Sequence, residues 1–269
     1  MALTNPPARR CMAVLSDIHG NLPALEAVLA EARRAGADVI VNLGDILSGP
    51  LWPAETAERL MALDLPTIAG NHERQVLTQA LERMSRTDAQ TAPLLNDAQR
   101  AWMAALPPTR WLTDDVFCCH GTPGSDLVYL METVTADHEP AGAPGIRAAT
   151  PAELAARLGV PDARLVLCGH SHVARTMQLG DTLVVNPGSV GLQAYDDDHP
   201  HRHRVEAGSP HARWVLAELR AGHWHVEHRL TPYDWEAAAL QAESKGRFDW
   251  ADALRTGFVG RYEREIAAT

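Results

Sequence analysis

Asp17 and His19 form the first pair of residues whose types and spacing could do chemistry. They follow the apolar run 12–15 within the segment Ser16-Asp17-Ile18-His19-Gly20. Residues i and i+2 of an extended chain point to the same side, so one carboxylate and one imidazole could hold one cation. Taken alone, this pair is better explained as a polar turn after a strand.

Four later segments repeat the arrangement of an apolar run followed by residues that can bind metal. They are Gly44-Asp45, Gly70-Asn71-His72-Glu73, His120-Gly121 and Gly169-His170-Ser171-His172. Each has a simpler explanation by itself, as a turn, a helix cap or a buried histidine. Together they indicate one site built from five distant parts of the sequence.

The elements around the first segments predict how they meet. Strands are expected over residues 11–15, 39–43 and 65–69, with helices over 21–35 and 53–63 between them. This alternation favours parallel strands joined by right-handed crossovers. Ligands of such sheets gather beyond the carboxyl ends of the strands. The residues that fall there are Asp17, His19, Asp45, Asn71 and His72.

The rest of the sequence is expected to continue as one α/β domain. Helices are predicted over residues 75–84, 96–106, 150–158 and 235–256. Two short strands are predicted within 111–119 and one over 165–168, and hairpins over 176–185 and 212–230. Residues 10–269 are therefore expected to form a single domain after a flexible tail of residues 1–9.

Two segments lack a regular pattern. Residues 124–149 are rich in glycine, proline and alanine and are interpreted as a long, lid-like loop, because long loops in compact domains are often functional. Residues 194–210 are interpreted as an exposed polar insert. Its histidines, His199, His201 and His203, could form a surface metal site, but a solvated loop is the favoured explanation.

The composition is that of an acidic globular protein. The sequence comprises 269 residues, of which 46% are hydrophobic, and carries a formal net charge of -10. That charge disfavours binding to long nucleic acids. Four scattered cysteines without a Cys-x-x-Cys pair indicate reduced thiols, and neither a signal peptide nor a membrane span is recognised. A cytoplasmic protein is therefore expected.

In their order, the five segments resemble the signature of the calcineurin-like metallophosphoesterases: D-x-H, G-D, G-N-H-E/D, a single central histidine and G-H-x-H. The resemblance runs from residue 17 to residue 172 and continues through Asn186-Pro187-Gly188-Ser189. The short spacing is similar to that of the small prokaryotic, phosphodiesterase-like branch. The fold that this implies is α/β, a four-layer αββα sandwich of two mixed β-sheets flanked by helices.

The resemblance also implies a dinuclear metal site. The first metal would be held by Asp17, His19 and His172, the second by Asn71, His120 and His170, and Asp45 would bridge the two. Oxygen and imidazole donors without a thiolate suit manganese, which is favoured here, with Fe, Zn, Ni or Mg as alternatives. His72 would donate a proton to the leaving group, a role that suits an imidazole with a pKa of about 6.5.

The implied activity is hydrolysis of a small phosphodiester or phosphomonoester by metal-bound hydroxide. Diesters are favoured, because residues 46–50 lack the Asp-Arg-Gly that follows Gly-Asp in serine/threonine protein phosphatases. An arginine that relatives often place soon after N-P-G-S is also missing, so Arg202 or Arg204 could contact the phosphate instead. The alternatives are a non-catalytic metal-binding or protein-interaction module on the same fold, and a nuclease, which the acidic surface disfavours.

Overall fold

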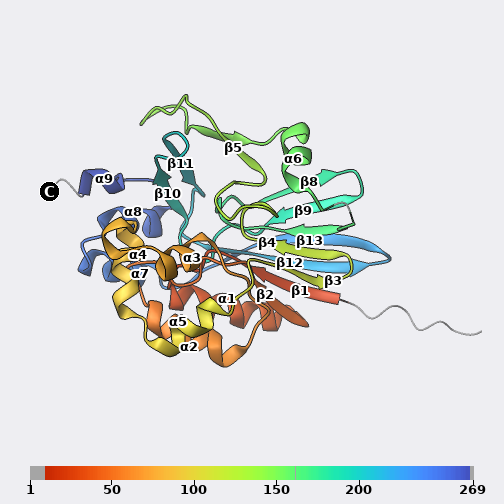
Figure 1. The fold of residues 1–269 in the computed structure, drawn as a ribbon, viewed down its shortest axis with the longest axis horizontal. Coiled ribbons are helices and arrows are strands. Elements are labelled where there is room, and N and C mark those ends of the chain that lie inside the picture. Colours follow the sequence, from red (N-terminus) through yellow and green to blue (C-terminus); the bar gives the residue numbers. More distant parts are fainter. Residues whose placement is uncertain (1–9, 161, 267–269) are drawn as a thin grey trace, which may run out of the picture.

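Two β-sheets packed face to face form the centre of the molecule, with helices outside both (Figure 1). The computed structural model describes residues 10–160 and 162–266. The flexible tail expected over residues 1–9 lies outside the described residues. Apolar side chains from both sheets, among them Val14, Val41, Cys118 and Leu167, form one buried cluster between the sheets.

The first sheet contains the strand that leads to Asp17. Strand β1 (Arg10–Leu15) pairs in parallel with β2 (Val39–Asn42) and antiparallel with β12 (Ala212–Arg220), which continues into the hairpin strand β13 (His223–Thr231). The spatial order is β13-β12-β1-β2. The parallel pair brings the carboxyl ends of β1 and β2, and therefore the loops that follow them, to the same edge.

The second sheet is also mixed. Its strands are β3 (Thr109–Thr113), β4 (Val116–Cys119), β7 (Leu165–Leu167), β8 (Arg175–Leu179) and β9 (Thr182–Asn186), in the order β3-β4-β7-β9-β8. The pairs β4–β7 and β7–β9 are parallel, and the two outer pairs are antiparallel. The central strands are short runs of buried apolar residues, as strands covered on both faces require.

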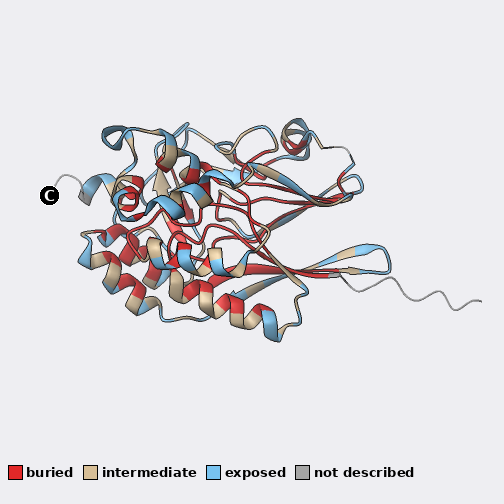
Figure 2. Ribbon diagram, turned by 60° about the horizontal axis from the view of Figure 1, so that its bottom comes forward, coloured by how far each residue is buried: buried red, intermediate tan, exposed pale blue. Residues whose placement is uncertain are grey.

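Helices complete the four layers. Three of them, α1 (Leu22–Arg34), α2 (Pro53–Leu63) and α5 (Asp97–Ala104), pack their apolar faces on the outer side of the first sheet. Helix α6 (Pro151–Leu158) covers the second sheet with Leu154 and Leu158. Figure 2 shows buried residues along the strands and on the inward faces of the helices. The predicted αββα sandwich of two mixed sheets is confirmed.

The remaining helices are short. They are α3 (Asn71–Thr78), the 3-10 helix η1 (Leu81–Arg83), α4 (Arg86–Thr91), the 3-10 helix η2 (Ala92–Leu94), α7 (Trp235–Ser244), α8 (Phe248–Thr256) and α9 (Glu263–Ile266). None of the helices in the described residues combines the length and the apolar composition needed to span a bilayer. The four cysteines are buried, and no disulfide joins them in the described part of the protein.

Two predictions near the third ligand segment were wrong. The strand expected over residues 65–69 is only an isolated bridge between Asn42 and Thr67, because Pro66 has no N–H with which to extend a ladder. The helix expected over 75–84 begins earlier, at Asn71, and ends at Thr78. Its early start follows from the Glu73 carboxylate, which accepts the N–H of Gly70 at 2.8 Å and caps the first turn.

Both segments expected to be irregular contain a hairpin. Within 124–149, β5 (Glu132–Val134) pairs with β6 (Ile146–Ala148). Within 194–210, β10 (Ala194–Asp197) pairs with β11 (His203–Glu206). The description of the insert as an exposed polar loop was therefore wrong. Burial of Ala194 and Val205 explains why the strands of the insert are stable despite their polar neighbours.

Candidate metal centre

The first cluster of potential ligands contains Asp17, His19 and His172. One donor atom of each residue lies within 4.8 Å of the other two, and all three residues are buried. The Nε2 atoms of His19 and His172 are 3.1 Å apart, and His172 Nε2 lies 3.4 Å from an Asp17 oxygen. These are the three residues that the sequence predicts for the first metal.

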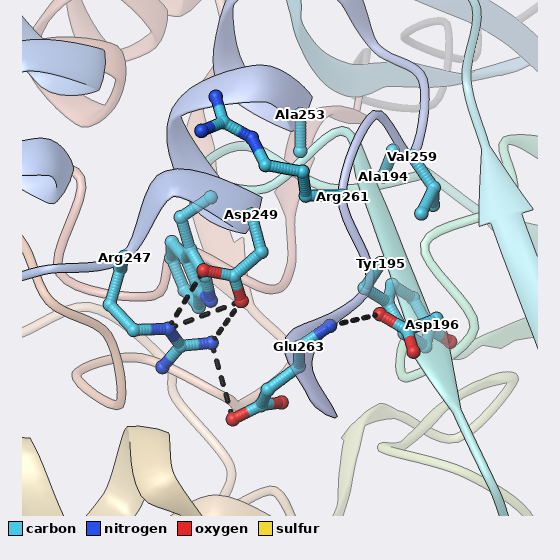
Figure 3. A pocket seen from close by; sticks show the side chains of 10 residues that line it. Ala194, Tyr195, Asp196, Arg247, Asp249, Ala253, Val259, Arg261 and Glu263 are labelled. Carbon is cyan, nitrogen blue, oxygen red and sulfur yellow. Dashed lines mark hydrogen bonds and ion pairs between the residues drawn. The ribbon is translucent and has the colours of Figure 1, made fainter. Parts of the chain in front are cut away.

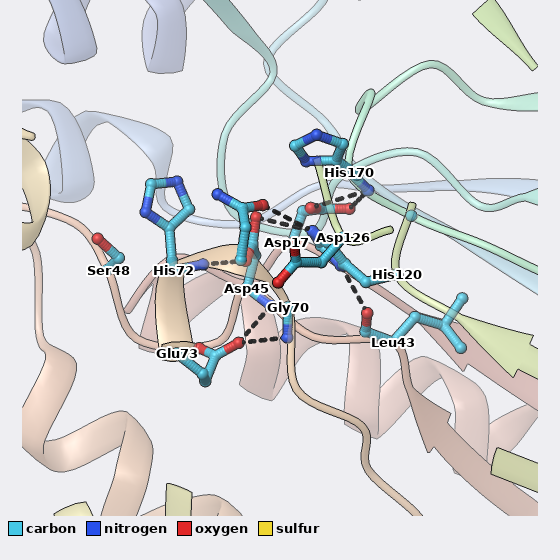
Figure 4. Close-up of polar contacts among 12 residues, drawn as sticks. Asp17, Leu43, Asp45, Ser48, Gly70, His72, Glu73, His120, Asp126 and His170 are labelled. Atoms are coloured by element: carbon cyan, nitrogen blue, oxygen red, sulfur yellow. Dashed lines mark hydrogen bonds and ion pairs between the residues drawn. The ribbon is translucent and has the colours of Figure 1, made fainter. Parts of the chain in front are cut away.

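The second cluster contains Asp45, His120 and His170, with donor atoms again within 4.8 Å of one another. His120 Nε2 is 3.0 Å from Asp45 Oδ2 and 3.2 Å from Asn71 Oδ1. The backbone N–H of His170 donates to the Asp17 carboxylate at 3.2 and 3.3 Å, which joins this cluster to the first (Figure 4). The structure therefore brings all seven predicted ligands together, while the bridging role of Asp45 stays a prediction.

Backbone hydrogen bonds hold the first two ligand loops side by side. The N–H of Asp17 donates to Gly44 O at 3.0 Å, and the N–H of His19 donates to Asp45 O at 3.0 Å. Because β1 and β2 are parallel neighbours, their register continues past the ends of the strands into these loops. The loops can therefore present their side chains to the same point.

The N-P-G-S segment supports the same loops from the other side. Asn186 Nδ2 donates to Gly169 O at 2.7 Å, and Ser189 Oγ donates to Asp17 O at 2.8 Å. Neither side chain belongs to a donor cluster. The segment therefore acts by fixing the backbone of the loops that carry Asp17 and His170.

Glu73, the last residue of Gly-Asn-His-Glu, has a structural role. Its carboxylate accepts the N–H groups of Asp45 at 2.9 Å, Ile46 at 2.8 Å and Gly70 at 2.8 Å. Gly70 is required there, because a Cβ at this position would lie 2.2 Å from Asp45 Oδ1. These contacts fix the Asp45 loop against the start of α3.

Three of the four imidazoles in the clusters have their Nδ1 atoms bonded to backbone carbonyls. The pairs are His19 with Ser48 O at 2.7 Å, His120 with Leu43 O at 2.8 Å, and His172 with Leu192 O at 2.8 Å. A carbonyl only accepts, so in the neutral form of each ring Nδ1 carries the proton and Nε2 presents its lone pair. When both rings are neutral, the lone pairs of His19 and His172 face each other at 3.1 Å, and a cation bound by both would relieve their repulsion. The donor set fits a divalent metal ion.

The backbone at the ligands is unusual. Asp17, His19, Asp45, His170 and His172 all have φ between 50° and 68°, in the left-handed region. Non-glycine residues rarely adopt this region, and it clusters at functional sites. In the described part of the protein, only two other non-glycine residues have a positive φ. The strain is therefore concentrated on the ligand loops.

Burial and charge set the protonation of the imidazoles. Burial, together with the nearby His172, lowers the pKa of His19 to about 3, and burial with the nearby His120 lowers the pKa of His170 to about 4. Both are neutral at pH 7, as metal ligands must be. Burial also lowers the pKa of His120, but the Asp45 carboxylate outweighs it and raises that pKa to about 9. A metal bound by His120 must displace this proton.

His72 lies beside the two clusters without belonging to either. Its ring meets that of His19 edge-on at a centroid distance of 5.4 Å, and its Nδ1 lies 2.7 Å from Asp88 Oδ1. Burial lowers the pKa of His72, but the carboxylates of Asp45 and Asp88 outweigh it and raise the pKa to about 10. His72 is therefore protonated at neutral pH, the state that a proton donor requires.

Asp88 was not predicted as part of the site; it lies on α4, between the helices expected over residues 75–84 and 96–106. The carboxylate is almost fully buried and also accepts hydrogen bonds from Ser48 Oγ at 2.5 Å and Ser85 Oγ at 2.9 Å. The Ser85-x-x-Asp88 spacing could have revealed the helix start. Nothing in the sequence indicates that Asp88 reaches His72.

Two tyrosines beside the ligands were also missed. The ring of Tyr129 lies 4.8 Å from that of His170, and the ring of Tyr195 lies 4.7 Å from that of His172. Their hydroxyl groups are 2.7 Å apart, and Tyr129 Oη is 3.0 Å from Nε2 of the buried His203. The hairpin β10–β11 thus supports both histidines of Gly-His-Ser-His. The alternative surface site of His199, His201 and His203 is absent from the donor clusters of the described residues.

Figure 3 shows a small pocket whose lining includes Tyr195, Asp196 and Arg247. Tyr195 and Trp250 line it, and their rings contact the two histidines of the first cluster. Arg247 also lines the pocket, but it is buried and paired with Asp249 at 2.6 Å and with Glu263 at 3.4 Å. Its charge is therefore balanced within the protein.

The contacts of the insert arginines do not support a role in binding phosphate. Arg204 donates to the carbonyl oxygens of Glu139 at 2.7 Å and Gly142 at 2.6 Å. The guanidinium of Arg202 lies 4.5 Å from the ring of Tyr262. Arg204 thus joins the insert to residues 139–142, and Arg202 packs against a C-terminal aromatic ring.

Residues 11–207 match the family model described as the calcineurin-like phosphoesterase superfamily domain. The sequence is also 42% identical over 66 residues to the uncharacterized protein MJ0912 of Methanocaldococcus jannaschii, a match that covers 24% of this protein and 27% of that one. It is 42% identical over 71 residues to the phosphodiesterase YfcE of Escherichia coli K12, covering 23% and 39% of the two proteins. The matched segments span less than half of either relative.

The similarity to solved structures extends over most of the protein. A metallophosphoesterase from Sphaerobacter thermophilus superposes with a TM-score of 0.69 at 22% identity, over 92% of this protein and 99% of that one. The hypothetical protein PH1004 from Pyrococcus horikoshii OT3 gives a TM-score of 0.69 at 18% identity, over 92% and 98%. At these identities the likeness establishes a shared fold.

Proposed function

The protein belongs to the calcineurin-like phosphoesterase superfamily, and from that premise we propose that it is a hydrolase of small phosphate esters with a dinuclear metal centre. The observation that carries the proposal is the meeting of seven oxygen and imidazole donors, six of them on buried residues, in two joined clusters. The first metal is assigned to Asp17, His19 and His172, and the second to Asn71, His120 and His170, with Asp45 between them. Manganese is the metal we favour.

The metals and the side chains divide the chemistry. When bound, two divalent ions supply a nucleophile at neutral pH, by lowering the pKa of water toward about 7, and stabilise charge on the phosphate. The protein fixes the tautomer of its imidazoles through carbonyls and excludes bulk water by burying the ligands. His72 donates the proton of Nε2 to the leaving ester oxygen as the P–O bond breaks, and its Nδ1 stays bonded to Asp88.

The substrate class is proposed from chemistry and from the relatives. Two cations balanced by two aspartates leave the centre locally positive, which attracts a phosphate ester to an otherwise acidic protein. We favour a diester, in line with the name of the relative YfcE and with the missing protein-phosphatase motif. We further propose that residues 10–269 act as one domain in the cytoplasm, on small substrates and without a long nucleic acid or membrane partner.

Turnover of bis-p-nitrophenyl phosphate tests the proposal. Protein loaded with Mn²⁺ should hydrolyse it, and His72→Ala should lower kcat by about 10²–10⁴-fold while leaving metal content unchanged. A matched control is His225→Ala, an exposed histidine at the far end of the β12–β13 hairpin, which should behave like the wild type. A wild type without activity on mono- and diesters, with any of several metals, would instead favour a non-catalytic module.

A further inference from the structure

The proposed centre needs a group that holds the phosphate, and the arginines considered so far are engaged elsewhere. Arg247 is buried with two carboxylates, and Arg204 is bonded to carbonyl oxygens. The following inference rests on the proposed function and concerns a different arginine, Arg74. It follows Asn71-His72-Glu73 directly in the sequence.

The helix places Arg74 next to the second cluster. Helix α3 begins at Asn71, and residues three apart on a helix lie on the same face, so Arg74 is one turn above that candidate ligand. The side chain of Arg74 is 44% exposed and is therefore reachable from solvent. The carboxylate of Asp126 raises the pKa of Arg74, and the carboxylate of Asp45 adds to this effect. The guanidinium therefore lies within electrostatic reach of the second cluster.

The partner of Arg74 comes from a distant part of the sequence, the segment that follows β4. Arg74 Nε and Nη2 donate to the two carboxylate oxygens of Asp126 at 2.7 and 2.8 Å. Three residues further along, the ring of Tyr129 packs on the ring of His170, with a centroid distance of 4.8 Å. In Figure 4, Asp126 is drawn within the same group of side chains as Asp45 and His170. The ion pair thus connects helix α3, which begins at Asn71, to residues 126–129, which lie beside His170.

A carboxylate that binds a guanidinium through two oxygens has the geometry of a phosphate that does the same. We propose that Arg74 binds the non-bridging oxygens of the substrate phosphate and that Asp126 occupies the guanidinium when no substrate is present. An exposed ion pair is weak and exchangeable. A phosphate held by the metals can therefore displace Asp126, and Asp126 competes with the substrate for Arg74.

The test compares four variants by two measurements. The measurements are the dissociation constant of inorganic phosphate by calorimetry on Mn²⁺-loaded protein and the KM for bis-p-nitrophenyl phosphate. Arg74→Ala should raise both the dissociation constant and the KM by about 10- to 100-fold. Asp126→Asn should lower both constants several-fold, and the double variant should not show this decrease. The control Arg147→Ala removes another exposed two-bond pair, with Glu153 at 2.9 and 2.9 Å, and should change neither.

Two results would overturn the proposal. One is an Arg74→Ala protein that binds phosphate as tightly as Arg147→Ala. The other is an Asp126→Asn protein weakened as much as Arg74→Ala, which would assign the pair to bracing the loop. If even the wild type turns over no ester, the proposed function fails, but the phosphate affinities still decide the role of Arg74.

Discussion

Most of the candidate ligands have backbone angles that residues other than glycine seldom adopt. Asp17, His19, Asp45, His170 and His172 are all left-handed, and each such residue costs about 1–3 kcal/mol. The surrounding hydrogen bonds, such as that from Asp17 N to Gly44 O, offset this cost. The motifs predict which residue types meet, but they say nothing of the strain with which the fold holds them.

The pair of His72 and Asp88 predicts a specific pH dependence. A general acid must be protonated, so activity should fall as pH rises through the pKa of His72, which the two carboxylates raise. Asp88→Asn removes one of these carboxylates and should move the alkaline limb of the kcat profile down by about 1–3 pH units. The measurement is a pH–rate profile at saturating metal. If the alkaline limb does not move, the group whose deprotonation it reports is not His72.

The second metal should compete with a proton on His120. Because Asp45 raises the pKa of His120 to about 9, metal binding at pH 7 must release that proton. Affinity for this metal should therefore increase about tenfold per pH unit below pH 9. The first metal should show no such dependence on His19, which is neutral throughout. Calorimetry at several pH values checks this, and identical pH dependence of both metals would contradict it.

The bounds of a helix or strand are predicted correctly where its own residues determine them, and wrongly where contacts with distant residues do. Helix α2 (Pro53–Leu63) begins and ends where its proline and its apolar face predict. Helix α3 starts early because Glu73 bonds to Gly70 and Asp45, and no local pattern shows the second contact. The hairpin β10–β11 was missed because buried partners from outside the segment, above all Tyr129, stabilise its polar strands.

This hairpin should matter for metal binding, because the ring of Tyr195 packs against His172. Tyr195→Ala removes the ring and should lower metal affinity at the first cluster about tenfold, as loss of a supporting contact usually does. Tyr195→Phe keeps the ring and should stay close to the wild type. Metal titration of both variants checks this. Equal losses in the two would assign the effect to the hydroxyl group, against our expectation.

At the scale of the whole molecule, the two sheets bring together residues that are far apart in the sequence. Asp17 and His172 are 155 positions apart in numbering yet 3.4 Å apart in space, because parallel strands of both sheets end at the same edge. The ordered motifs predicted the sandwich and the seven side chains that the structure brings together, and metal binding by these side chains stays a prediction. The motifs could not predict Asp88, Tyr129 or Arg74, whose places depend on loops and short helices without a recognisable pattern.

A centre of this kind should make stability depend on metal. A metal that binds the folded protein and not the unfolded one stabilises it, and a ligand at 100 times its Kd adds about 2.7 kcal/mol to the free energy of unfolding. Removing metal with a chelator should lower Tm by about 5–10 °C, and Mn²⁺ should restore it. His172→Ala should lose most of this response, whereas His225→Ala should keep it. A Tm that does not change when the chelator is added would contradict the prediction that bound metal stabilises the folded protein.

Anomalous diffraction from crystals soaked in Mn²⁺ tests the central claim most directly. We predict two peaks roughly 3.5–4 Å apart, one among Asp17, His19 and His172 and the other among Asn71, His120 and His170, with Asp45 between them. A map without a peak at these donors, or with manganese only at surface histidines, would contradict the dinuclear centre.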